Sequence, residues 1–217
     1  IDGGRVDLPA FQVAMDGINV RLFRAMENGQ ISLDATVSAL RHTLDTPYVM
    51  PLGADISVST DLETAQYSVG IRDGLEGTVA GTHQIRTGEG SAQLNLTPID
   101  LAAGGGISTL SPIAAEWIAA AEGKVGLAGS VSWGAEGLHP DVVLSMDQVG
   151  LTGEAGRLSK ISGDLHFDSL SPPTTSEPQY LTAVAAFSKF DAVPLDLVFQ
   201  LAPGRLLLDR GSADILG

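Results

Sequence analysis

The side chains that come closest to a reactive arrangement in this sequence are Asp164, His166 and Asp168. Alternate residues of a β-strand point to the same face, so a strand here would present one imidazole and two carboxylates together. Such a set of side chains could bind a divalent cation. The intervening residues Leu165 and Phe167 are apolar, and a strand that buries one face carries polar side chains on the other. The favoured interpretation is therefore the solvated face of an amphipathic strand, and we predict no metal ligands.

Other patterns of catalytic residues are absent or uninformative. The sequence has no Gly-x-Ser-x-Gly nucleophile motif, and its glycine run at 104–106 is not followed by the lysine of a phosphate-binding loop. It has no cysteine, which excludes thiolate catalysis and cysteine-based zinc sites. Carboxylate pairs such as Asp61 with Glu63 are expected by chance among 26 acidic residues. We therefore predict a non-enzymatic protein with no cofactor.

The composition excludes several classes of protein. With 26 acidic and 12 basic residues in 217, the formal net charge is −14, which opposes binding to nucleic acid. A hydrophobic fraction of 44% with only 18% charged residues contradicts intrinsic disorder. The sequence has no run of about 18 apolar residues, so we expect no transmembrane helix in it. We expect the chain to fold or to bind an apolar ligand, and to be a segment of a longer protein.

The dominant pattern is an alternation of apolar and polar residues, which indicates β-strands with one apolar face. It predicts strands at 11–15, 18–22, 31–37, 56–62, 67–71, 94–96, 125–133, 142–146, 161–167 and 195–201. Turn-forming residues lie between several of them, as at 28–29, 73–74 and 136–137. Strands joined by tight turns are typical of antiparallel sheets. The strongest helix signal is the alanine-rich run at 112–122, which is preceded by a serine at the N-cap position, begins with a proline and is followed by Gly123.

The apolar faces of about a dozen strands must be covered, and one helix of about three turns could cover little of that area. They must meet a second sheet, the same sheet closed on itself, or a ligand. A closed β-sandwich and an open sheet curled around lipid are both compatible with the pattern. In the C-terminal half, the residues expected on the apolar face are Val125, Leu127, Val131, Trp133, Val142, Leu144, Met146, Ile161, Leu165, Phe167, Leu195, Leu197, Phe199 and Leu201.

The second half of the sequence resembles a known family. Its motifs are Leu-Ser-Pro at 110–112, a glycine-rich segment ending in tryptophan at 123–133, ISGDLHFDSLSPPTT at 161–175 and VPLD at 193–196. These motifs are similar to the C-terminal region of YdbH-like proteins, within the AsmA-like group that includes TamB. The family also carries an older label of dicarboxylate transport, but the arginines of this sequence are scattered rather than clustered as a carboxylate site requires.

The resemblance implies a bridge through the periplasm of Gram-negative bacteria, anchored in the inner membrane by a segment outside this chain. It implies an all-β fold, an extended antiparallel twisted sheet curled into an apolar-lined groove (β-taco like), along which phospholipid moves between the inner and outer membranes.

The expected regions are strand repeats at 1–109, as part of the same groove, and a YdbH-like C-terminal region at 110–217. The expected partners are phospholipid and, through regions outside the chain, the two membranes. The alternative function is that of a closed β-sandwich that holds protein partners and no lipid. Unpaired edge strands could also let copies of the fragment associate.

Overall fold

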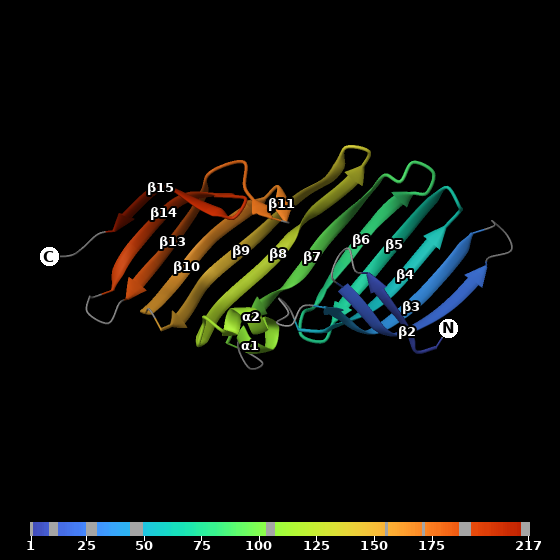
Figure 1. Cartoon of the computed structure of the whole chain (residues 1–217), viewed down its shortest axis with the longest axis horizontal. Helices are drawn as coiled ribbons and strands as arrows, with labels where there is room; N and C mark the ends of the chain where they lie inside the picture. Colours follow the sequence, from blue (N-terminus) through green and yellow to red (C-terminus); the bar gives the residue numbers. More distant parts are fainter. Residues whose placement is uncertain are drawn as a thin grey trace. The chain divides into compact units, whose positions relative to one another are not determined.

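A computed structural model describes the chain at residues 2–8, 13–24, 30–43, 50–102, 107–154, 156–170, 172–186 and 192–213. These residues form β-strands almost throughout (Figure 1). The strands are β1 (Gly4–Leu8), β2 (Val13–Arg24), β3 (Ile31–His42), β4 (Leu52–Thr60), β5 (Thr64–Arg72), β6 (Gly77–Gln84), β7 (Gly90–Asp100), β8 (Ala120–Gly134), β9 (Gly137–Gly153), β10 (Gly156–Phe167), β11 (Ser169–Leu170), β12 (Pro173–Thr174), β13 (Gln179–Ala186), β14 (Val193–Ala202) and β15 (Arg205–Ala213). The two helices, α1 (Ile107–Leu110) and α2 (Pro112–Ala115), have four residues each.

Thirteen of the strands form one sheet in the order β1-β2-β3-β4-β5-β6-β7-β8-β9-β10-β13-β14-β15, and β11 pairs only with β12. Strands that follow one another in the chain are neighbours in the sheet, except that β11 and β12 are left out between β10 and β13, and some of the connections are tight turns. After β5, for example, Asp73 and Gly74 both have positive φ angles, of 68° and 113°, and reverse the chain. The sheet is not closed, because β1 and β15 stand at opposite ends of this order. The predicted all-β, antiparallel fold is thereby confirmed.

The predicted helix at 112–122 is much shorter in the structure. Helix α2 ends at Ala115, and β8 already begins at Ala120. The Ala119 N–H donates a hydrogen bond to the Thr152 carbonyl at 2.8 Å, so the second part of the alanine-rich run runs beside β9. Helix propensity is a weak preference, and here the pairing with a neighbouring strand overrides it. The prediction of helix beyond residue 115 was therefore wrong.

Contacts between residues divide the chain into two compact units. The first comprises Ile1–Thr97, Leu110–Pro112 and Ser130–His139, and the second comprises Pro98–Thr109, Ile113–Gly129 and Pro140–Gly217. Strands β1 to β6 lie in the first unit and β10 to β15 in the second, whereas β7, β8 and β9 contribute residues to both. Each unit therefore has a sheet face of its own.

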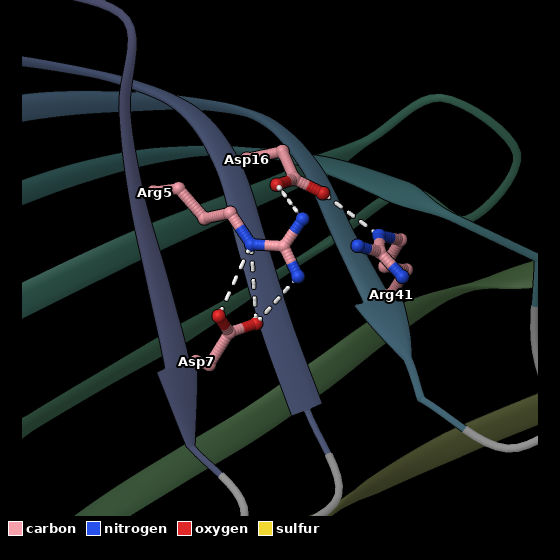
Figure 2. A network of polar contacts seen from close by, with 4 residues as sticks. All are labelled: Arg5, Asp7, Asp16 and Arg41. Carbon is pink, nitrogen blue, oxygen red and sulfur yellow. Dashed lines mark hydrogen bonds and ion pairs between the residues drawn. The ribbon is translucent and has the colours of Figure 1, made fainter.

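Charged side chains on three strands hold the N-terminal edge of the first unit (Figure 2). Arg5 of β1 pairs with Asp7 of the same strand at 2.8 Å and with Asp16 of β2 at 3.5 Å. Arg41 of β3 reaches the same Asp16 at 2.7 Å. The hydrogen bond from Arg5 lowers the pKa of the Asp7 carboxyl group. Single exposed ion pairs contribute little, but this network links the edge strand to its two neighbours and favours one register.

Candidate functional site

In the first unit, the strand register gathers apolar side chains into rows that cross the sheet. One row passes through directly paired residues of the six strands β2 to β7: Val20, Ala35, Ile56, Val69, Val79 and Leu94. The row beside it is polar or small: Asn19, Thr36, Asp55, Gly70, Thr78 and Asn95. Because successive side chains of a strand point to opposite faces, these six strands have one apolar and one hydrophilic face. Apart from the buried Ala35, the members of the apolar row are only half-buried.

The residues predicted to line the apolar face all lie on strands, and none of them is exposed. Val131 and Trp133 belong to the first unit and all the others to the second. In the second unit the register places Leu144 of β9 directly opposite Leu165 of β10. Four members of the set are buried, and the others are half-buried: the buried ones are Val142, Ile161, Leu165 and Phe199. Their positions fit the expected lining, and their contact with lipid stays a prediction.

Among the residues that the structure describes, no second large sheet and no long helix lies over these faces, although single residues such as Val37 and Val142 are fully buried. The helices have four residues each, and the separate β11–β12 ladder has two residues per strand. A single sheet that is not closed differs from the closed β-sandwich of the alternative interpretation, which needs two sheets packed face to face.

Asp164, His166 and Asp168 share the hydrophilic side of the second unit, where they line a cavity of about 620 Å³. The Asp168 carboxylate accepts a hydrogen bond from the Thr174 hydroxyl at 2.9 Å. Hydrogen bonds from Ser176 and Thr174 lower the pKa of Asp168. Across the described ranges, no three His, Cys, Asp or Glu side chains are arranged to hold a metal ion. Asp168 instead fixes the loop that follows β10.

A cluster of polar rings on the apolar face of the first unit was missed by the sequence reasoning. Trp133 Nε1 of β8 donates a hydrogen bond to His83 Nδ1 of β6 at 3.2 Å, and the two rings stack with their centroids 6.1 Å apart. The Tyr67 hydroxyl of β5 donates to the Ser91 carbonyl at 3.1 Å, and burial raises the pKa of this hydroxyl. The alternation in β6 could have placed His83 on this face, because His83 continues the series of half-buried residues that includes Val79.

Comparison with known protein families gives a match over almost the whole chain. The family model described as "YdbH-like: Intermembrane phospholipid transport protein YdbH" matches residues 2–217. The match includes the first half of the chain, in which the sequence motifs showed no resemblance. No curated protein and no solved structure matches the chain. Within the described residues, no helix is long and apolar enough to cross a membrane.

Proposed function

Because the chain belongs to the YdbH-like family of intermembrane phospholipid transport proteins, we propose that it is a periplasmic segment whose apolar sheet faces shield phospholipid acyl chains between the inner and outer membranes. The observation that carries this proposal is the apolar row that crosses β2 to β7, whose members other than Ala35 stay half-buried, with no second large sheet among the described residues. In water, such a face is stabilised when another apolar surface covers it. An acyl chain has the chemistry to do so.

The size of the apolar face suits acyl chains that lie along the strands. Six strands at a spacing of about 4.8 Å make the face about 24 Å wide. Along β5, the four residue steps from Tyr67 to Ile71 span about 13 Å. This length is close to the roughly 15 Å that one leaflet contributes to the hydrocarbon core of a bilayer. Each methylene that is fully removed from water contributes about 0.8 kcal/mol, so ten half-buried methylenes would contribute about 4 kcal/mol. That gain is large enough to hold a lipid and small enough to let it move on.

The same chemistry sets the selectivity. Aliphatic side chains offer no hydrogen bonds, so the face accepts acyl chains of different length and unsaturation. The net charge of −14 keeps the hydrophilic side in water and disfavours adsorption to anionic membrane surfaces. Attachment to the inner membrane and delivery to the outer membrane would fall to regions outside this chain. The proposed role involves no catalytic step.

A pair of neighbouring substitutions on β8 tests the proposal. Leu127 is half-buried on the apolar side, and the adjacent Ala128 is exposed on the other side. Leu127→Asp places a carboxylate on the apolar face, whereas Ala128→Asp adds the same charge to the hydrophilic face. Burying an unpaired charge costs several kcal/mol, so we expect Leu127→Asp to lower bound phospholipid by at least about tenfold and Ala128→Asp to leave it unchanged.

The measurement is native mass spectrometry of the chain purified from bacterial envelopes, with lipid extraction of the same sample. Far-UV circular dichroism verifies that both variants keep the β-sheet, and Leu127→Ala replaces Leu127→Asp if the latter does not fold. Equal lipid content in the two variants would contradict the assignment of the apolar face. A lipid-free wild-type chain that takes up none from liposomes would overturn the proposed function itself.

A further inference from the structure

Three polar rings mark one end of the apolar face in the first unit. This aromatic end consists of Tyr67 of β5, His83 of β6 and Trp133 of β8. Tyr67 is the fourth residue of β5, whereas His83 and Trp133 are the next-to-last residues of their strands. The start of β5 and the ends of β6 and β8 lie at the same end of an antiparallel sheet. The three rings are thus beside the loops at 61–63, 85–89 and 135–136.

Two glycines allow these rings to reach across neighbouring strands. A Cβ atom at Gly90 of β7 would lie 2.5 Å from Trp133 Cζ2, so the indole occupies the space above this glycine on its way to His83 of β6. A Cβ atom at Gly81 of β6 would lie 2.6 Å from the Tyr67 hydroxyl, which reaches over β6 to β7. Both rings therefore lie against the sheet, each over a glycine of a neighbouring strand.

The hydrogen bond between Trp133 and His83 also determines which ring nitrogen of His83 carries the proton. An indole N–H can only donate, so the Nδ1 of His83 must accept, and the proton of the neutral imidazole lies on Nε2. No hydrogen bond to His83 Nε2 is formed within the described part of the chain. The half-buried face therefore holds an N–H group that can donate to an oxygen atom of a ligand.

The opposite end of the same strands has a different character. There the register joins Ile71 of β5, Gly77 of β6 and Leu96 of β7, so the side chains are aliphatic or missing. The apolar face of the first unit thus changes along its strands from purely aliphatic to aromatic with polar tips. A phospholipid has the same gradient, from acyl chains to the ester and phosphate oxygens.

We propose that the aromatic end binds the ester and phosphate region of a phospholipid, with the acyl chains directed toward Ile71 and Leu96. Rings with an apolar body and a polar tip prefer the boundary between apolar and wet surroundings, as they do at membrane interfaces. His83 Nε2 supplies a hydrogen bond to a lipid oxygen. This orientation rests on the proposed function, because it gives the cargo of that face one direction.

Quenching of Trp133 fluorescence tests the orientation. Trp117→Phe removes the other tryptophan, which is 77% exposed and lies in the second unit, and leaves Trp133 as the reporter. The chain is loaded from phosphatidylcholine vesicles whose acyl chains carry bromine either near the ester or near the terminal methyl group. We expect bromine near the ester to cause the larger loss of Trp133 emission.

Phosphate analysis of the reisolated chain separates the two ways in which the test can fail. Bound lipid with stronger quenching by the methyl-end bromine, or with equal quenching by both, would overturn the orientation and leave the proposed function intact. The absence of both bound lipid and quenching would overturn the proposed function and the orientation with it.

His83→Phe tests the hydrogen bond, because it keeps a ring at this position and removes the donor. One hydrogen bond corresponds to a loss of roughly three- to tenfold in phospholipid affinity. Binding of diphenylhexatriene, a hydrocarbon probe without oxygen atoms, should not change. Equal effects on the two ligands, or unchanged binding of phospholipid, would contradict the role of His83.

Discussion

Replacing Gly90 with alanine should destabilise the first unit, whereas the same change at Gly70 should not. Both glycines lie within strands of this unit, and neither has a positive φ angle. They differ in the space above them. A Cβ atom at position 90 would lie 2.5 Å from Trp133 Cζ2 and 2.6 Å from the Thr82 carbonyl oxygen. At position 70 the nearest atom, the Asp55 carbonyl oxygen, is 3.9 Å away.

The magnitude follows from these contacts. Carbon atoms pack at about 3.5–4.0 Å, so the indole must retreat by about 1 Å, which breaks its 3.2 Å hydrogen bond to His83. The lost hydrogen bond and ring contact cost about 1 kcal/mol each, and crowding against the Thr82 carbonyl costs about 1–3 kcal/mol. The lower entropy of the unfolded chain offsets about 0.4–1 kcal/mol of this. We expect Gly90→Ala to lower the free energy of unfolding by about 2–5 kcal/mol, and Gly70→Ala to change it by less than about 1 kcal/mol.

Urea unfolding measures both effects in one background. With Trp117→Phe in every protein, Trp133 emission reports the first unit alone, and far-UV circular dichroism verifies the sheet. Gly90→Ala should also shift the native Trp133 emission to longer wavelength, because the displaced indole meets more water. If Gly90→Ala and Gly70→Ala unfold at the same urea concentration and have the same native emission, the packing of Trp133 over Gly90 is wrong.

Two further predictions concern pH and the sheet edges. The Asp61 carboxylate accepts hydrogen bonds from the backbone N–H groups of Thr64 and Glu63, and these lower its pKa. Because the pKa is lower in the folded state, the ionised carboxylate stabilises the fold above the unfolded pKa of about 4, and this contribution is lost as the pH falls further. In thermal unfolding at pH 5 and pH 3, Asp61→Asn should therefore lose less stability on acidification than the wild type. Equal losses of stability in the two proteins would contradict this prediction. The strand β15 lies at one end of the strand order, and its Leu206 and Leu208 are 62% and 59% exposed. Lysine at both positions should reduce concentration-dependent self-association in sedimentation velocity, because charged side chains oppose the pairing of edge strands. An unchanged distribution of sedimentation coefficients would contradict edge pairing.

The fold was predictable because one rule governs most of it. In a single-layer sheet the side chains alternate strictly between a wet and an apolar face, so patterns such as Val125, Leu127 and Val131 indicate both the strand and its buried side. The predicted helix at 112–122 was wrong beyond residue 115, because no such alternation determines the structure there. Its alanines carry a local preference and no strong pattern, and the Thr152 carbonyl of a distant strand determined the outcome.

The sequence predicted one part of the candidate site, the apolar face, and missed the other, the aromatic end. Membership of the apolar face was predicted from alternation along one strand; the predicted residues lie on strands and none is exposed, and their role as a lipid lining stays a prediction. The aromatic end depends on which strands are neighbours. Trp133 and His83 are 50 residues apart, and their contact requires β7 to carry Gly90 between them. Such contacts need the register of several strands, which periodicity in one segment does not provide.

On the proposed function, the cargo takes the place of the missing second layer. In a closed sandwich, side chains from a second sheet would bury residues such as Val69 and Leu94 completely, whereas here they stay half-buried. A lipid that covers them stabilises the folded chain by mass action, and the chain in turn gives up that contribution when the lipid leaves. On this proposal, transport is favoured by a face that binds acyl chains weakly at many similar positions. The apolar row would offer one such position on each of the strands β2 to β7, and the aromatic end would give the bound lipid a direction.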